Sequence, residues 1–197
     1  ERTVVRMRWY LFALNEFAKQ GKTVIASHEI AEKVGVKPGL VRKDLCHFGG
    51  FGRPSVGYNI AYLQSKIREI LRINQVKRVA WVGAKTMLGN PALVRRFAEN
   101  KCDVMAVFDA GNDMLGDKVA KLEVQHFDLI EETVRRHGID AAVIAGLSGT
   151  DAQTAADRLV AGGVKAILNL SPVVIVVPKG VAVRNLDLVS ELMMLSY

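Results

Sequence analysis

The chain lacks several features that would assign it to a specialised class of protein. Its 197 residues include two cysteines, Cys46 and Cys102, which lie far apart in the sequence. Such a pair provides neither a disulfide framework nor a metal-binding spacing, so we expect a protein of the reducing cytoplasm. No apolar run is long enough to span a membrane: residues 173–177, for example, have the length of a strand, so no membrane partner is expected. The opening residues, ERTVVRMRWY, lack the apolar core of a signal peptide.

What the sequence does contain is an uneven distribution of charge. Residues 1–80 carry 15 Lys and Arg against 6 Asp and Glu, whereas residues 81–197 carry 12 against 14. The first part therefore has a formal net charge of +9 and the second a net charge of −2, which together give the +7 of the whole chain. A basic segment joined to a nearly neutral one favours a domain that binds a polyanion. Nucleic acid is the first candidate, and a solvated basic surface is the alternative.

The basic segment predicts a helix-turn-helix followed by a wing. Apolar spacing predicts helices over residues 4–20, 28–34 and 38–48, with Ser27 as the cap of the second helix. Two short helices joined by a tight turn at Gly35 are typical of DNA-binding proteins, whose second helix lies in the major groove. The next ten residues, GGFGRPSVGY, contain four glycines and a proline and predict a basic hairpin with Arg53 at its tip. A helix over residues 60–74 follows as a linker.

The rest of the chain alternates between apolar runs and amphipathic segments. The pattern predicts strands at RVAWVG, DVMAVFD, DAAVIAG, KAILNLS, VVIVV and VAVRNL, with helices between most of them. This alternation predicts an α/β, Rossmann-like domain with a mostly parallel sheet covered by helices on both faces. We place the boundaries at 1–77 for the winged helix, 78–186 for the Rossmann-like domain and 187–197 for a terminal apolar helix. That helix is suited to a swap between subunits or to a dimer contact.

The loop WVGAKTMLGN follows the first predicted strand, where a G-x-G-x-x-G dinucleotide loop is expected. Gly83 and Gly89 are six residues apart instead of five, and Lys85 takes the place of the middle glycine. Lys85 either obstructs a pyrophosphate, pairs with its phosphates, or belongs to a pocket that has closed. Asp109 ends the second predicted strand and is placed to accept hydrogen bonds from a ribose hydroxyl pair, which favours NAD(H) over NADP(H). The alternative is that Asp109 caps a loop.

Acid–base groups are scarce in the loops that would bind a ligand. Ser148 and Ser171 fall in such loops, but no histidine is obviously paired with either of them, which disfavours a catalytic triad. We therefore expect a sensor and not an enzyme, with no catalytic residue and no metal ligand. A small NAD-dependent oxidoreductase with an accessory basic domain is the disfavoured alternative. The four histidines, all outside these loops, are His28, His47, His126 and His137.

Short motifs distributed over nearly the whole chain carry a family resemblance. They are VRKDL, FGGFG and VGY in the first half, VAWVGA, LG and VFD around the glycine loop, and ILNLSPV, VPKGVAVRNLDL and LSY near the end. On these residues the chain resembles the Rex family of redox-sensing transcriptional repressors. The resemblance implies a homodimer that represses genes of fermentative and respiratory metabolism. It implies binding of operator DNA when NADH is low, release when NADH rises, and a C-terminal helix that swaps between subunits.

The resemblance also supplies candidate binding residues. The family loop reads G-A-G-N-L-G or similar, so Lys85 and one inserted residue are departures in this chain. The alternative function is a DNA-binding regulator of the same fold that responds to another ligand or has lost NAD(H) sensing. The candidates for DNA are Lys37, Arg42, Lys43, His47 and Arg53. The candidates for NAD(H) are Gly83, Ala84, Lys85, Leu88, Gly89, Asp109, Ser148 and Pro172.

Overall fold

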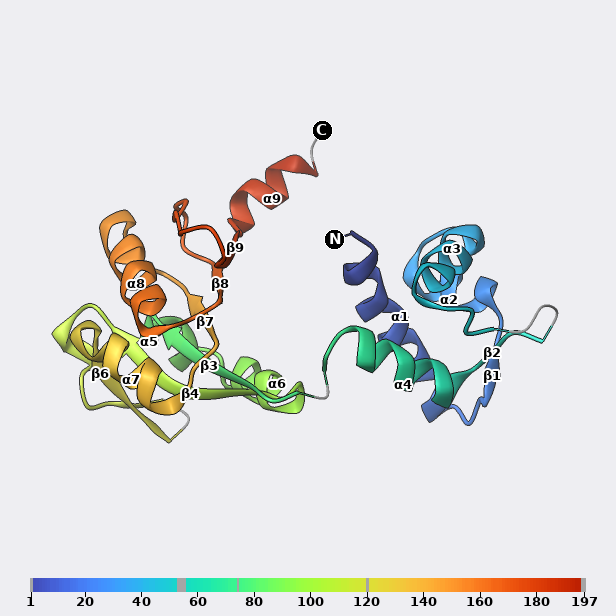
Figure 1. Cartoon of the computed structure of the whole chain (residues 1–197), viewed down its shortest axis with the longest axis horizontal. Helices are drawn as coiled ribbons and strands as arrows, with labels where there is room; N and C mark the ends of the chain where they lie inside the picture. Colours follow the sequence, from blue (N-terminus) through green and yellow to red (C-terminus); the bar gives the residue numbers. More distant parts are fainter. Residues whose placement is uncertain (1, 53–55, 74, 120, 196–197) are drawn as a thin grey trace. The chain divides into compact units, whose positions relative to one another are not determined.

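The computed structural model describes residues 2–52, 56–73, 75–119 and 121–195, and it divides into two compact units (Figure 1). Unit 1 comprises Glu1–Gln75 and unit 2 comprises Val76–Tyr197. Among the described residues, no helix has both the length and the apolar character needed to cross a membrane.

Unit 1 is a small helical domain with one short pair of strands. Its core is apolar and is formed by residues from each of the four helices in its described part, Met7, Ile30, Leu45 and Leu63 among them. Strands β1 and β2 pair antiparallel, with Ile25 opposite Tyr58. The elements are α1 (Arg2–Lys19), β1 (Val24–Ile25), α2 (Ser27–Val34), α3 (Pro38–Phe48), β2 (Tyr58–Asn59) and α4 (Ile60–Ile70).

The helix-turn-helix is formed by α2 and α3. Gly35 ends α2 in the left-handed region with φ at 71°, a conformation that costs glycine little. Ser27 was expected to cap α2, and this prediction is wrong, because Ala26 is the N-cap residue and Ser27 is already helical. The carboxylate of Glu29 accepts the N–H of Ala26 at 2.9 Å. A side chain in the first turn, and not that of Ser27, therefore binds a free backbone N–H at the start of the helix.

The expected wing differs from the structure in its pairing. Tyr58 and Asn59, at the end of the glycine-rich segment, pair with β1, and no strand pairing within that segment is found among its described residues. Arg53, the predicted tip, lies outside the described residues. Helix α4 ends at Ile70, earlier than the predicted residue 74, and Asn59 caps it by accepting the N–H of Tyr62.

Unit 2 has a seven-stranded sheet in the order β5-β6-β4-β3-β7-β8-β9. All neighbouring strands are parallel except β5 and β6. The chain builds outwards from β3 through β4 to β6, and then returns to the other side of β3 for β7, β8 and β9. The strands are β3 (Lys77–Val82), β4 (Cys102–Asp109), β5 (Lys118–Val119), β6 (Leu122–His126), β7 (Ala141–Ile144), β8 (Ala166–Asn169) and β9 (Ala182–Asn185).

Helices cover both faces of this sheet. Along β3, Val79 and Trp81 pack into one apolar cluster and Ala80 and Val82 into another, as the two-residue period of a strand requires. The Trp81 cluster includes residues of α5 and α6, and the other cluster includes residues of α7 and α8. The helices are α5 (Ala84–Leu88), α6 (Pro91–Glu99), α7 (Ile130–His137), α8 (Gly149–Gly162) and α9 (Leu188–Met194), with short 3-10 turns at Asn112–Met114 and Phe127–Leu129.

The apolar segment VVIVV was expected to be a strand, and this prediction is wrong. The backbone of this segment is held by side-chain amides: Gln153 exchanges two hydrogen bonds of 2.9 Å with Val176, and Asn185 accepts the N–H of Ile175 at 3.1 Å. The place beside β8 is taken by β9. Apolar character alone does not separate a strand from a buried loop whose polar groups are satisfied by side chains.

Candidate functional site

A stripe of polar residues lies along the exposed face of α3. Arg42, Lys43, Cys46 and His47 are all exposed, whereas Val41 and Leu45 on the opposite side are buried in the core of unit 1. The spacing of the four is that of one helical face. The Arg42 guanidinium donates to the Ser27 hydroxyl at 3.0 Å, so Ser27, at the start of α2, orients one of the basic side chains.

The predicted DNA-binding residues are therefore brought together, apart from one. Arg42, Lys43 and His47 share the exposed face of α3, and Lys37 is its N-cap residue and is exposed. Arg53 lies outside the described residues. Cys46 and the bond from Arg42 to Ser27 were not among the predicted features of this face, although Cys46 follows Arg42 by four residues and Lys43 by three, a spacing that indicates a shared helical face.

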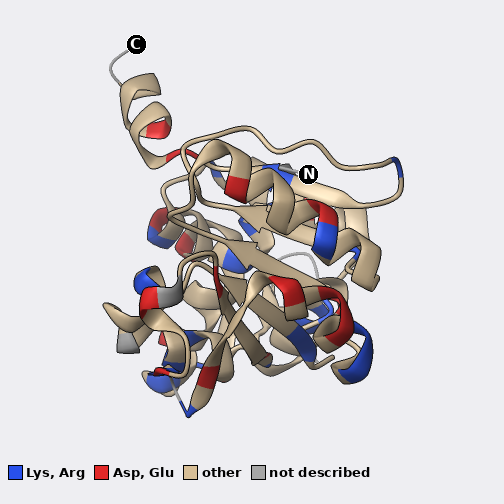
Figure 2. Ribbon diagram, turned by 90° about the vertical axis from the view of Figure 1, so that its left-hand side faces the viewer, with Lys and Arg blue, Asp and Glu red and all other residues tan. Residues whose placement is uncertain are grey.

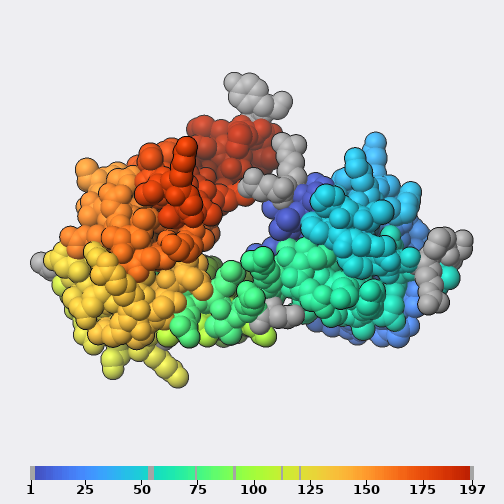
Figure 3. Space-filling view, viewed as in Figure 1, coloured from blue at the N-terminus to red at the C-terminus, as the bar shows by residue number. Residues whose placement is uncertain are grey.

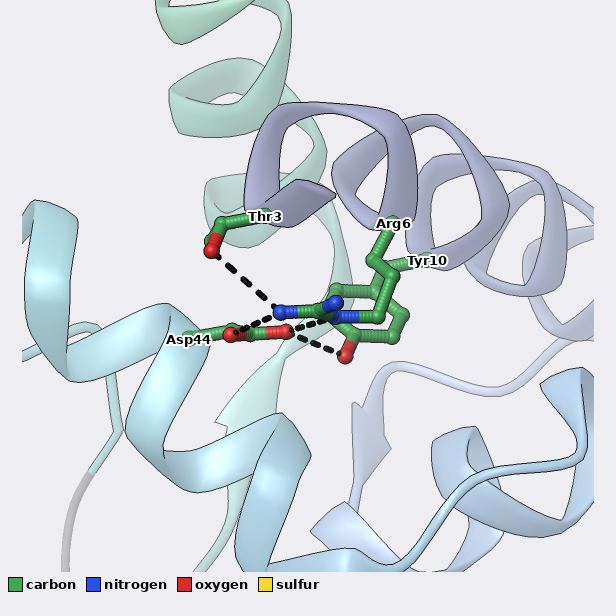
Figure 4. Close-up of polar contacts among 4 residues, drawn as sticks. All are labelled: Thr3, Arg6, Tyr10 and Asp44. Carbon is green, nitrogen blue, oxygen red and sulfur yellow. Dashed lines mark hydrogen bonds and ion pairs between the residues drawn. The ribbon is translucent and has the colours of Figure 1, made fainter. Parts of the chain in front are cut away.

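The buried side of α3 carries a carboxylate that is bound by two residues of α1 (Figure 4). Arg6 donates to Asp44 through Nε at 2.6 Å and through Nη2 at 2.8 Å, and the Tyr10 hydroxyl donates to the same carboxylate at 2.8 Å. Nη2 of Arg6 also donates to Thr3 at 3.2 Å. The hydrogen bonds from Arg6 hold the pKa of Asp44 below its usual value, against the effect of burial. Burial, assisted by Asp44, raises the pKa of Tyr10.

Unit 2 has a cavity of about 240 Å³ at the carboxyl ends of its central strands. This is the edge of a doubly wound sheet at which ligands bind, beside the strand where the chain changes direction. Its charged lining residues are two aspartates, Asp109 and Asp151, and one lysine, Lys85. The lining residues are Gly83, Lys85, Thr86, Asp109, Ala110, Gly111, Ala145, Gly146, Leu147, Ser148 and Asp151.

Gly83 forms the turn from β3 into α5, and no other residue fits there. Its φ is 102°, and a Cβ at this position would lie 1.9 Å from the carbonyl oxygen of Ala145. Two chain segments thus approach each other closely beside the cavity. Gly89, by contrast, has a helical φ of −70° and no close neighbour, so the last glycine of the motif is not required by the backbone here.

Asp109 lies at the end of β4 and faces the glycine turn. One carboxylate oxygen accepts the N–H of Ala84 at 2.9 Å and the other accepts the N–H of Gly111 at 3.2 Å. These bonds orient the carboxylate, and each oxygen retains a lone pair that can accept a further hydrogen bond. The two expectations for Asp109 are compatible in this geometry, because it holds the loop and still faces the cavity.

Lys85 occupies the position of the missing glycine and lies at the rim of the cavity. Its side chain is 69% exposed, and its ammonium group is 4.0 Å from a carboxylate oxygen of Asp113. A contact of that length between two exposed groups is weak. The side chain therefore does not fill the cavity, and its charge is available at the opening.

Trp81 lies under the glycine turn. Its indole N–H donates to the carbonyl of Gly83 at 3.2 Å and to the Thr86 hydroxyl at 3.1 Å, and Thr86 donates in turn to Gly83 at 2.7 Å. The ring packs edge to face against Phe97 at 5.5 Å. The bond from Trp81 to Thr86 could not be predicted from the sequence, because it depends on the turn at Gly83.

The predicted nucleotide-binding residues fall into two groups. Gly83, Lys85, Asp109 and Ser148 line the cavity. Ala84 is buried and contributes its backbone N–H to Asp109, whereas the side chains of Leu88 and Pro172 are exposed away from the lining. Gly89 ends α5 and also lies outside the lining. Among the described residues, no cluster of His, Cys, Asp or Glu is arranged to hold a metal ion.

The C-terminal helix α9, dark red in Figure 3, is left largely uncovered by its own unit, and most of its exposed side chains are apolar. Asp187 caps the helix by accepting the N–H groups of Val189 and Ser190. Acidic and basic segments are interspersed over the rest of unit 2, whereas α9 is mostly uncharged (Figure 2). Its exposed apolar residues are Leu188, Val189, Leu192, Met193, Met194 and Leu195.

The two units match family models separately. Residues 1–46 match the model described as "Putative DNA-binding protein N-terminus", and residues 74–173 match the model described as "CoA binding domain". The whole chain is 38% identical to the redox-sensing transcriptional repressor Rex of Streptomyces coelicolor, covering 76% of that protein. It is 37% identical to the Rex of Carboxydothermus hydrogenoformans, covering 94% of it.

The chain is also similar in fold to solved structures of a repressor called RSP. A structure of RSP in complex with β-NAD+ and operator DNA matches the whole chain with a TM-score of 0.90 at 32% identity, over 91% of that protein. A structure of RSP in complex with β-NADH matches with a TM-score of 0.87 at 30% identity, over 92% of it.

The fold and the two sites define a class of protein in which a helix-turn-helix unit is joined to a Rossmann-like unit with a ligand cavity. The agreement extends over the full chain in both sequence and structure. The chain belongs to the Rex family of redox-sensing transcriptional repressors. The resemblance drawn from the motifs of the sequence is thereby confirmed.

Proposed function

We propose that this chain binds operator DNA through the exposed face of α3 and that NADH in the cavity beside Gly83 releases it. The observation that supports this most directly is the presence of both halves of such a switch in one chain. A basic helix face is joined to a cavity whose entrance turn requires a glycine. RSP, a structural relative, has been solved with β-NAD+ and operator DNA together and with β-NADH.

On the DNA side, Arg42 and Lys43 supply charge and hydrogen-bond donors for phosphates and base edges. Lys37 lies at the amino-terminal end of α3, the end that approaches the bases in a helix-turn-helix. His47 and, outside the described residues, Arg53 complete the proposed set. Replacing Arg42 with Ala is expected to weaken operator binding at low salt, and an unchanged affinity would argue against this assignment.

On the nucleotide side, Asp109 is the proposed partner of a ribose hydroxyl pair. A carboxylate accepts from both hydroxyls and repels a 2′-phosphate, so NAD(H) is preferred to NADP(H). Gly83 lets the nucleotide approach the backbone, with Ala84 and Ser148 beside it. Leu88, Gly89 and Pro172 remain proposed contacts at the margin of the site.

Lys85 is proposed to pair with the nucleotide's phosphates. Its ammonium group lies at the cavity rim with no strong partner, and a phosphate offers a closer and more highly charged one than Asp113. The described cavity is smaller than the ~300–1,000 Å³ of typical ligand pockets, so it accommodates part of a dinucleotide and leaves the phosphates near the opening.

The protein is proposed to act in the cytoplasm as a homodimer without catalytic activity. The apolar surface of α9 is suited to a second subunit, and a two-fold dimer matches an inverted-repeat operator. No histidine lines the cavity among the described residues, which disfavours the alternative of an NAD-dependent oxidoreductase. Removing residues 187–197 is expected to abolish the dimer, and a truncated protein that stays dimeric and NADH-sensitive would refute the helix swap.

An NADH titration of the full-length protein tests the proposal. Trp81 is buried directly under the glycine turn, so energy transfer to a bound nicotinamide should quench its emission. The other tryptophan, Trp9, is replaced with Phe so that Trp81 alone reports. We expect saturable quenching at micromolar NADH, weaker with NAD+ and NADPH, and release of operator DNA over the same range.

Absence of quenching up to millimolar NADH, with operator binding intact, would favour the second candidate. That candidate is a regulator of the same fold with another ligand or none. The observation in its favour is Lys85 in place of the middle glycine.

A further inference from the structure

The DNA-reading helix contains a charge that cannot touch DNA. Asp44 directly follows Lys43 in α3, yet its side chain is only 4% exposed and points towards α1 (Figure 4). It is the only buried carboxylate among the described residues of unit 1. A carboxylate at this position brings one negative charge into the helix that must approach a polyanion, so stability and affinity alone do not account for it.

The three hydrogen bonds to Asp44 fix its geometry closely. The guanidinium of Arg6 engages both carboxylate oxygens in a planar fork, at 2.6 Å and 2.8 Å. The hydroxyl of Tyr10, which is fully buried, donates to one of the same oxygens at 2.8 Å. Arg6 and Tyr10 lie one helical turn apart on α1, so both act from the same face of that helix.

An apolar pair of similar volume would hold the two helices together equally well. Buried ion pairs add little net stability, because desolvation offsets their attraction, and replacing them with hydrophobic residues is often neutral or stabilising. An apolar contact, however, is not directional and tolerates rotation of one helix against the other. The two coplanar hydrogen bonds from Arg6 and the third from Tyr10 are directional, so they resist such a rotation.

A small rotation of α3 matters for reading bases. With side chains, a helix has a radius of about 5–6 Å, so a rotation of about 10° moves a surface atom by about 1 Å. Hydrogen bonds to base edges operate within about 0.5 Å in donor–acceptor distance. A rotation of that size would therefore break direct contacts of Arg42 and Lys43 with bases, whereas contacts with phosphates, which depend on charge at longer range, would largely persist.

We propose that Arg6 and Tyr10 are positioning residues for operator recognition, which set the rotation of α3 through Asp44. This rests on the proposed function of α3. The consequence is that selectivity for the operator depends on two residues of α1 that do not belong to the DNA-reading face.

The test uses a double substitution that leaves the charge of the protein unchanged. Arg6→Met with Asp44→Leu removes one positive and one negative charge, so the electrostatic attraction to any duplex is preserved. The matched control is Lys66→Met with Glu69→Leu, which removes an exposed ion pair of 2.8 Å from α4 in the same unit. Tyr10→Phe is the milder variant, since it removes one hydrogen bond and only the volume of a hydroxyl group.

The full-length wild-type protein is first used to select a duplex from a random-sequence pool. Affinities for the enriched duplex and for its scrambled version are then measured for each variant, together with the melting temperature. We expect the double variant to lose about tenfold or more in affinity for the enriched duplex, as for a lost base contact, while the scrambled duplex is bound as before. Tyr10→Phe should lose about two- to tenfold, and the control should match the wild type.

A double variant that melts like the wild type and binds the enriched duplex equally well would overturn the proposal. Equal losses on both duplexes would overturn it too, because they would indicate general damage to unit 1. If the double variant does not fold, Tyr10→Phe decides, and unchanged selectivity in that variant refutes the positioning role. A wild-type protein that enriches no sequence would instead refute the proposed DNA-binding function, and this inference with it.

Discussion

Replacing Gly83 with Ala should damage the nucleotide site more than its small size suggests. The new Cβ would lie 1.9 Å from the carbonyl oxygen of Ala145, and real contacts of this kind do not fall below 3.0 Å. The two groups must therefore separate by at least 1.1 Å. In addition, a Cβ in the left-handed region costs about 1–2 kcal/mol.

The separation also breaks hydrogen bonds at the end of the sheet. The N–H of Gly83 donates to Phe108 at 2.8 Å, and the N–H of Ala145 donates to Val82 at 2.9 Å. Each such bond contributes about 0.5–1.5 kcal/mol. Losing both adds about 1–3 kcal/mol to the conformational strain, so we expect the free energy of unfolding of unit 2 to fall by about 2–5 kcal/mol.

The assay is urea unfolding of the full-length protein, followed by the emission of Trp81 in a Trp9→Phe background. Gly163→Ala is the matched control, because Gly163 has a comparable φ of 112° but nothing within 4 Å of a Cβ. The control therefore measures the cost of a Cβ in the left-handed region without any steric contact. NADH titration of the same proteins should show that Gly83→Ala no longer binds, whereas Gly163→Ala does.

Two results would refute this reasoning. The first is a loss of stability for Gly83→Ala no larger than that for Gly163→Ala, which would mean that the contact with Ala145 relaxes without cost. The second is undiminished NADH quenching in Gly83→Ala, which would mean that the nucleotide does not approach this turn.

Three further predictions concern charged groups. Lys85→Ala should weaken NADH binding by about two- to tenfold and reduce its salt dependence, measured by Trp81 quenching, as for one exposed ion pair. Asp109→Asn should weaken NADH binding by about tenfold or more and reduce the preference over NADPH, measured by titrating both nucleotides. Because Arg6 lowers the pKa of Asp44, the stability from that carboxylate is present above its unfolded pKa of about 3.9 and is lost as the pH falls through the lower folded value. Acid unfolding followed by circular dichroism should therefore be less steep in the Arg6→Met, Asp44→Leu variant.

Each of these has a contrary outcome. Tighter NADH binding by Lys85→Ala would mean that the side chain obstructs the site. An unchanged preference in Asp109→Asn would leave this residue as a loop cap only. Identical acid unfolding of the wild type and the double variant would show that Asp44 is not protected by Arg6.

Structural features that depend on residues close together in the chain were predictable from the sequence. Helix α3 was placed correctly because its apolar residues follow a 3.6-residue period and Pro38 starts it. The parallel sheet followed from the alternation of strands and helices, and the cavity lined by Gly83 and Asp109 lies at the strand ends, where a ligand site was expected. The roles of Gly83 and Asp109 in nucleotide binding stay predictions. The segment VVIVV was misassigned because its polar partners, Gln153 and Asn185, lie 23 and 10 residues away along the chain, beyond the reach of a local pattern.

By itself, the sequence determined that a basic helix-turn-helix precedes an α/β domain with a glycine turn, since periodicity, charge and turn chemistry are local properties. Only the tertiary structure decided that Asp44, next to Lys43 in the sequence, faces away from it and binds Arg6, 38 residues earlier. It also decided that Lys85 leaves the cavity open and that Trp81 supports the turn above it. These contacts join residues that no local pattern links, because they form only when burial of the apolar faces brings separate elements together.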